Sequence, residues 1–151
     1  MNSQAPKAEE DSRAWAFAWA AWVLAMIAML GSLFFGEVMK LPPCTLCWYQ
    51  RICLFPLALL IAVGILERDP RLNRYTLPLV GVGLAIAAYH NLIYYGVLSE
   101  DLSPCTQGVS CGSRQIEWLG FITIPMLSFL GFLSILMCLV LHQRQPKRSP
   151  T

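Results

Sequence analysis

The sequence has few charged residues and long stretches that contain none. Charged residues make up 13% of the 151 residues, whereas hydrophobic residues make up 56%. A soluble domain of this length could not bury so much apolar surface. No internal repeat is present, and no basic stripe with interleaved aromatic residues points to nucleic acid. The composition therefore indicates a single-domain, all-α membrane protein that crosses the bilayer several times.

Four apolar segments are long enough to cross a bilayer as helices at about 1.5 Å per residue. They comprise residues 14–35, 46–66, 75–98 and 118–141. We expect residues 14–141 to form a four-transmembrane-helix bundle. Residues 1–13 are polar and are predicted to be a disordered tail, and residues 142–151 form a basic tail. The first segment exceeds the apolar core of a signal peptide, so it is expected to be retained.

Lysine and arginine are unevenly divided between the two predicted sides of the membrane. Eight of them lie on one side: Lys7, Arg13, Arg68, Arg71, Arg74, Arg144, Lys147 and Arg148. The other side has Lys40 and Arg114, with Arg51 just inside the second span. Because cytoplasmic loops carry the excess of positive charge, both termini are predicted to be cytoplasmic. The intervening loops would then face the periplasm or the cell exterior.

The six cysteines fall into two groups. Four lie in polar or boundary segments, namely Cys44, Cys47, Cys105 and Cys111. Two crossings separate the first pair from the second, so both pairs must emerge on one membrane face. In an oxidising compartment, two neighbouring dithiols can pass a disulfide between them through a mixed-disulfide intermediate. Two static disulfides or a four-cysteine zinc site are the alternatives. Cys53 and Cys138 lie inside apolar runs and are predicted to be packing residues.

Polar residues inside the spans are the next candidates for function. Arg51 follows Cys47 by four residues; it could favour a thiolate and donate to a carbonyl oxygen, or it could snorkel to the headgroups. His90 could serve a lipid-soluble carbonyl acceptor such as a quinone, or bond a neighbouring helix. Asn91 is predicted to join two helices. Pro125 is predicted to kink the fourth helix, with Thr123 satisfying a freed backbone group.

These motifs together resemble the disulfide-bond formation protein B family, DsbB, and within it the short-loop BdbC-like branch. The resemblance covers the chain from the first span to the fourth. It rests on Pro43-Cys44-Thr45-Leu46-Cys47 followed by Arg51, on Tyr89-His90, on the loop Pro104-Cys105 to Cys111, and on Gly120-Phe121-Ile122-Thr123-Ile124-Pro125-Met126-Leu127-Ser128.

The resemblance implies a bundle that reoxidises a soluble thioredoxin-fold partner and passes two electrons to a membrane quinone, either ubiquinone or menaquinone. It implies that Cys105 and Cys111 face the partner, with Cys105 forming the mixed disulfide. Cys44 and Cys47 would face the quinone, with Cys47 nearest the ring.

By the same resemblance, Arg51 and His90 match quinone-side residues of the family. Only five residues separate Cys105 from Cys111, so the loop has less reach than in better-known DsbB proteins. A vitamin K epoxide reductase-like enzyme is the alternative enzyme class, and the order of the cysteine pairs disfavours it. A tetraspan protein with structural disulfides or zinc is the non-enzymatic alternative.

Overall fold

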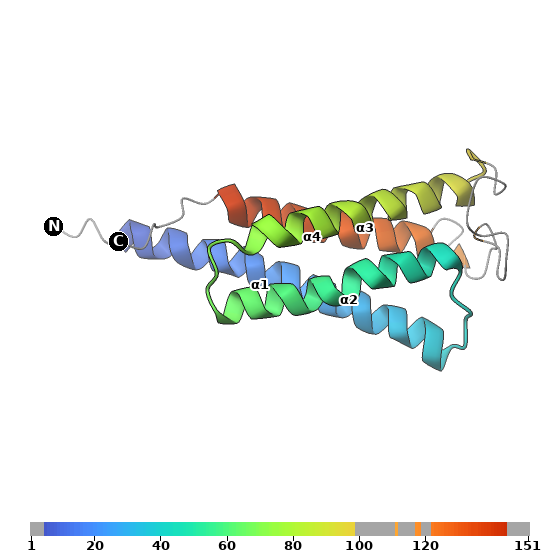
Figure 1. The fold of residues 1–151 in the computed structure, drawn as a ribbon, viewed down its shortest axis with the longest axis horizontal. Helices are drawn as coiled ribbons and strands as arrows, with labels where there is room; N and C mark the ends of the chain where they lie inside the picture. Colours follow the sequence, from blue (N-terminus) through green and yellow to red (C-terminus); the bar gives the residue numbers. More distant parts are fainter. Residues whose placement is uncertain (1–4, 99–110, 112–116, 119–121, 145–151) are drawn as a thin grey trace.

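The computed structural model describes residues 5–98, 111, 117–118 and 122–144, which form a four-helix bundle (Figure 1). The helices are α1 (Ala5–Leu33), α2 (Thr45–Leu66), α3 (Leu72–Tyr94) and α4 (Ile124–Arg144). A π-helical turn, η1 (Phe34–Val38), continues α1, and two short strands, β1 (Glu117–Trp118) and β2 (Ile122–Thr123), pair in antiparallel fashion before α4. Within these ranges, four helices are long and apolar enough to cross a membrane. The predicted all-α, four-span fold is confirmed.

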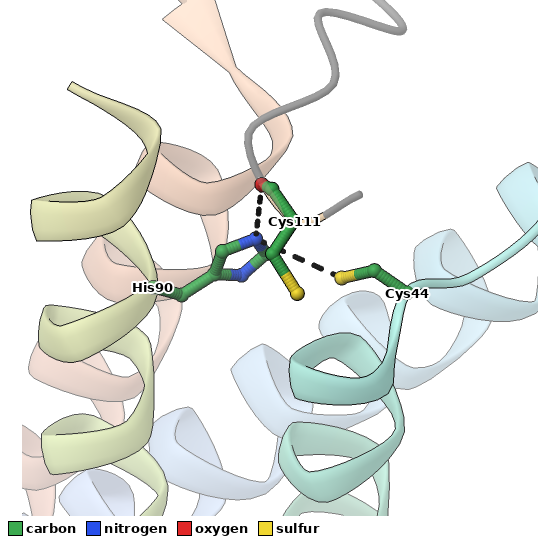
Figure 2. A group of neighbouring side chains, drawn as sticks. All are labelled: Cys44, His90 and Cys111. Atoms are coloured by element: carbon green, nitrogen blue, oxygen red, sulfur yellow. Dashed lines mark hydrogen bonds between the residues drawn. The ribbon is translucent and has the colours of Figure 1, made fainter. Parts of the chain in front are cut away.

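The helices form a closed ring in which each packs against its sequence neighbours, and α1 also packs against α4. His142 near the end of α4 donates from Nδ1 to the carbonyl oxygen of Ala14 in α1, at 2.8 Å. The first and last helices are therefore joined at one end of the bundle. At the opposite end, Cys44 before α2, His90 in α3 and Cys111 gather in a small cluster (Figure 2). Cys44 and Cys111 therefore lie at the same end of the bundle, as the count of crossings predicted.

Two predicted boundaries are wrong. Helix α1 begins at Ala5, so most of the tail predicted to be disordered is helical. Helix α4 begins at Ile124 rather than at residue 118. Residues 117–118 and 122–123 instead form the short strand pair.

Pro125 does not kink α4, because it lies in the first turn of that helix. A backbone N–H at that position has no partner within the helix, so proline is tolerated there. Thr123 does satisfy a backbone group: its Oγ1 accepts from the N–H of Met126 at 3.3 Å, as a helix N-cap does. Asn91 joins two helices as predicted, since its Nδ2 donates to the Pro125 carbonyl at 2.8 Å.

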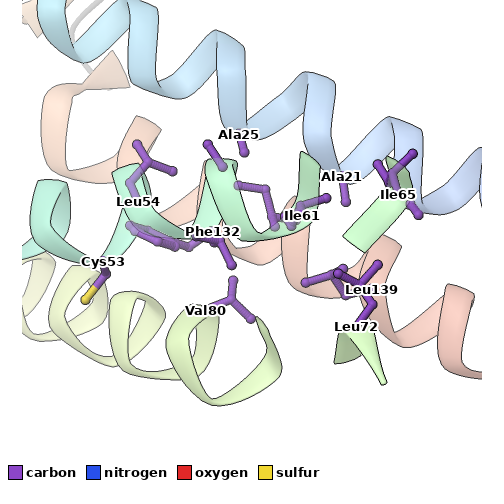
Figure 3. Close-up of a cluster of buried hydrophobic side chains, with 14 of the residues drawn as sticks. Ala21, Ala25, Cys53, Leu54, Ile61, Ile65, Leu72, Val80, Phe132 and Leu139 are labelled. Atoms are coloured by element: carbon purple, nitrogen blue, oxygen red, sulfur yellow. The ribbon is translucent and has the colours of Figure 1, made fainter. Parts of the chain in front are cut away.

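The bundle core combines small residues on α1 with mostly larger apolar residues on the other helices, Phe132 among them (Figure 3). Ala18, Ala21 and Ala25 are fully buried, so α1 approaches its neighbours closely. Cys53 is buried in this core and Cys138 packs against it. The prediction that these two cysteines are packing residues is confirmed. Many large apolar side chains face outward, as expected of helices surrounded by lipid.

Candidate active site at the cysteine end of the bundle

The first cysteine pair lies where α2 begins. Cys44 has an extended backbone and is the N-cap of the helix, and its Sγ accepts from the N–H of Cys47 at 3.4 Å. The two sulfur atoms are 2.8 Å apart, and both residues are free cysteines. The hydrogen bond from the Cys47 thiol, aided by the His90 ring, lowers the pKa of Cys44 to about 4 against the opposing effect of burial. Cys44 is therefore set up to act as a thiolate.

Cys111 belongs to the second predicted pair and lies beside the first. It is buried and disulfide-bonded, whereas Cys105 lies outside the described residues. The Sγ atoms of Cys44 and Cys111 and a ring nitrogen of His90 all lie within 4.8 Å of one another (Figure 2). A thiolate on one of these sulfurs is thus close enough to reach the other after a small movement. The geometry brings the two predicted pairs together through Cys44.

His90 lies between the two pairs and is almost fully buried. Its Nε2 is 3.7 Å from Cys44 Sγ and 3.3 Å from the carbonyl oxygen of Cys111. On its other side, Nδ1 is 3.2 Å from Nε2 of Gln50 in α2, and Gln50 Oε1 accepts a hydrogen bond from the Ser128 hydroxyl in α4. A chain of hydrogen bonds thus runs from Ser128 through Gln50 and His90 to the cysteines.

Arg51 points across to α1 rather than to the membrane surface. Its Nε donates to Ser32 Oγ at 2.8 Å, and its Nη2 donates to the Ser32 carbonyl at 2.6 Å. The guanidinium lies over the Trp48 ring, with 5.3 Å between Cζ and the ring centroid. A Cβ on Gly36 would lie 2.7 Å from Nη2, so a larger residue there would make the guanidinium shift from this position. Arg51 is therefore buried and fixed, and the snorkelling interpretation is wrong.

A cavity of about 460 Å³ lies beside the first cysteine pair, bounded mainly by α1, α2 and α4. Its walls include Phe35, Pro42, Cys44, Cys47, Arg51 and Leu127. A largely apolar wall with a few convergent polar groups is typical of a site for a small lipophilic molecule. Arg51 has donors to spare there, since in the described part of the chain Ser32 takes only its Nε and Nη2.

Cys44, His90 and Cys111 also resemble a metal-ligand set, because each offers one donor atom to a common point. Two features oppose metal binding in this arrangement. The sulfur of Cys111 is held in a disulfide. The Nε2 of His90 faces the carbonyl oxygen of Cys111, which can only accept, so this nitrogen carries a proton rather than a free lone pair.

Three polar residues of this site did not emerge from the sequence patterns: Ser32, Gln50 and Ser128. Gln50 directly precedes Arg51 in an apolar span, and a buried amide in a membrane helix needs a partner. That signal could have identified Gln50. Ser32 lies on a helix rich in small residues, and Ser128 was only the last residue of the motif that carries the resemblance, so neither serine was assigned a role.

The lowered pKa of Cys44 predicts a nearly flat pH profile for its alkylation. In the reduced protein, the thiolate should persist far below the pH at which an ordinary cysteine is protonated. The rate at Cys44, followed by mass spectrometry of its peptide, should change little between about pH 6 and pH 8. A rate that falls by about tenfold per pH unit over that range would show an ordinary thiol instead.

Comparisons with known proteins agree on one family. The family described as "Disulfide bond formation protein DsbB" matches residues 12–142. "Disulfide bond formation protein C" of Bacillus subtilis is 44% identical over 126 residues, which cover 82% of this chain and 91% of that protein. "Probable disulfide formation protein C 2" of Bacillus cereus is 46% identical over 122 residues, covering 81% and 87% of the two chains. "Probable disulfide formation protein" of Metapseudomonas resinovorans is 38% identical over 125 residues, covering 82% and 87%. No solved structure matches.

Proposed function

Because this chain belongs to the DsbB family of disulfide bond formation proteins, we propose that it is a membrane thiol:quinone oxidoreductase. It reoxidises a soluble thioredoxin-fold thiol oxidase outside the cytoplasm and passes the electrons to a membrane quinone. The observation that carries this proposal is the placement of Cys44, which lies within 4.8 Å of both Cys111 Sγ and a ring nitrogen of His90 and also lines the cavity.

Electrons enter at the second cysteine pair. The partner's dithiol reduces the Cys105–Cys111 disulfide, with Cys105 forming the mixed disulfide. The Cys111 thiolate then attacks Sγ of Cys44 in the Cys44–Cys47 disulfide; a Cys44–Cys111 bond forms and Cys47 leaves as a thiolate. Attack by the Cys105 thiolate on Cys111 Sγ restores the Cys105–Cys111 disulfide and releases Cys44. In the structure, Cys44 and Cys47 are free thiols and Cys111 is in a disulfide. These are the redox states expected after the exchange is complete.

The cavity residues fit a quinone as the acceptor. The apolar wall suits its ring and tail, and the free donors of Arg51 suit a ring carbonyl oxygen. A bound quinone would accept the two electrons of the reduced Cys44–Cys47 pair, with one proton from the Cys47 thiol and one from solvent, because Cys44 is already a thiolate. Both cysteines line the cavity; Cys47 is partly exposed, whereas Cys44 is buried and its sulfur lies beside His90 and Cys111. This division of tasks supports Cys47 as the cysteine nearest the acceptor and Cys44 as the one that exchanges with the outer pair.

The membrane orientation is part of the proposal. Cys44 and Cys111 lie at the end of the bundle opposite the contact between Ala14 and His142. The excess of lysine and arginine at the Ala14 end supports a cytoplasmic location for that end. The exchange chemistry would then take place at the periplasmic or outer surface of the bacterial cytoplasmic membrane, where disulfides persist.

A trapped intermediate tests the proposed exchange. In a Cys47→Ser/Cys105→Ser variant, Cys44 and Cys111 each lose their usual partner, so we expect oxidation by dissolved oxygen to join them in a disulfide with each other. Peptide mass spectrometry without reduction should find this bond as the main product. A Cys44→Ser/Cys105→Ser variant is the matched control, because it leaves Cys47 and Cys111. If the control forms its bond as readily as the first variant, Cys44 is not the exchanging residue.

A further inference from the structure

The proposed reaction does not explain why Gln50 is buried beside the cysteines and bonded to Ser128. Gln50 is 7% exposed and makes two hydrogen bonds, one to His90 in α3 and one to Ser128 in α4. Three helices therefore meet through one amide side chain. Buried polar networks of this kind fix a single arrangement when every member is satisfied.

The direction of each hydrogen bond in this network follows from the chemistry of its partners. The carbonyl oxygen of Cys111 can only accept, so Nε2 of His90 donates to it at 3.3 Å. The amide nitrogen of Gln50 can only donate, so Nδ1 of His90 accepts at 3.2 Å. The Ser128 hydroxyl donates to Gln50 Oε1, which holds the amide in this orientation. The contacts of both ring nitrogens thus require the same tautomer, in which Nε2 carries the proton and Nδ1 does not.

We propose that Gln50 and Ser128 are positioning residues that hold the His90 ring in the tautomer with its proton on Nε2, directed at the Cys44 sulfur. In this state, Nε2–H supports negative charge on Cys44 from 3.7 Å, and it also contacts the backbone of Cys111. The Nε2–H group of His90 can therefore stabilise the negative charge on Cys44 when Cys44 is released as a thiolate. The stabilisation of a released Cys44 thiolate rests on the proposed function, whereas the assignment of the His90 tautomer does not.

Nuclear magnetic resonance of the ring nitrogens can test the tautomer directly. The chain has only two histidines, and His142 supplies an internal reference because its Nδ1 donates to the Ala14 carbonyl. In full-length protein labelled with ¹⁵N-histidine, we expect His90 to be protonated on Nε2 alone and His142 to carry a proton on Nδ1. The His90 result should hold in the oxidised protein and after reduction with one equivalent of dithiothreitol.

Four variants separate positioning from general packing. Gln50→Leu removes the donor to Nδ1, and Ser128→Ala frees the amide to turn; both should give His90 a mixture of tautomers. Gln50→Glu supplies an acceptor, so His90 should gain a proton on Nδ1 while keeping the one on Nε2. Ser134→Ala is the matched control, because that serine lies on the same helix but bonds the Leu130 carbonyl. It should leave the His90 signals unchanged.

The reactivity of Cys44 gives an independent readout. In Gln50→Leu, the pH at which the alkylation rate of Cys44 falls to half its plateau should rise by about one unit, so that the rate measured well below pH 4 slows by roughly tenfold. Gln50→Glu should retain the wild-type rate, because Nε2 still donates to the sulfur. The inference is overturned if wild-type His90 carries a proton on Nδ1, or if Gln50→Leu changes neither the tautomer nor the alkylation rate. Failure of quinone reduction alone would count against the proposed function and leave this inference standing.

Discussion

Replacing Cys47 by serine should lower quinone reduction to below about one thousandth of the wild-type rate. A serine cannot form the disulfide through which the inner pair delivers two electrons, so no other step can compensate. Cys47 also lines the cavity beside Arg51, where the acceptor is proposed to bind. The rate is measured as loss of quinone absorbance with a reduced thioredoxin-fold partner in excess.

The same variant should keep its reaction with the partner. Cys105 remains, so a mixed disulfide between Cys105 and the partner should still accumulate, and gel electrophoresis without reduction detects it. Cys53→Ser is the matched control, since Cys53 lies in the bundle core and has no proposed part in the exchange. Substantial quinone reduction by Cys47→Ser would place the electron exit elsewhere.

Replacing Arg51 by leucine should raise the KM for quinone by about 10- to 100-fold. Hydrogen bonds from a charged donor contribute about 1.5–3 kcal/mol, and each 1.4 kcal/mol corresponds to about tenfold in affinity. The effect follows from the loss of the free guanidinium donors at the cavity wall. Exchange between the two cysteine pairs should continue, because Cys44, His90 and Cys111 remain in place.

Two further variants show whether the effect of Arg51 is direct. Ser32→Ala removes the hydroxyl that accepts from Nε but keeps the charge and the bond to the Ser32 carbonyl. Its KM should therefore rise by no more than about tenfold, since a typical hydrogen bond contributes about 0.5–1.5 kcal/mol. Arg51→Lys keeps the charge but loses the two hydrogen bonds that the guanidinium donates to Ser32. Its KM for quinone should lie between those of Ser32→Ala and Arg51→Leu. An unchanged KM in Arg51→Leu would remove Arg51 from the acceptor site.

Apolar segment length was enough to predict four helices and the shared face of the cysteine segments. It could not place the helix ends, because those depend on local caps. Gly96 has a left-handed backbone with φ of 73° just after α3, and so the third helix stops before the predicted limit at residue 98. The start of α4 is fixed by the Thr123 side chain, which a scan for hydrophobicity passes over.

The sequence predicted the main residues of the site but not the hydrogen bonds that orient them. Cys44 was found because it forms a close pair with Cys47 at the boundary of a span, and Arg51 because a charge inside a span is rare. The contacts that orient Arg51 and His90 come from Ser32, Gln50 and Ser128 on three helices. Such contacts depend on how the helices are rotated against one another, and a single sequence contains no direct record of that rotation.

The most direct test of the proposed route is a single-turnover experiment that measures both the quinone reduced and the disulfide formed in the partner. Stopped-flow mixing of the purified protein, quinone and a fully reduced thioredoxin-fold partner should reduce one quinone for each disulfide formed in the partner. A Cys44→Ser/Cys47→Ser variant should reduce none. If that double variant still oxidised its partner with quinone as sole acceptor, the route through Cys44 and Cys47 would be contradicted.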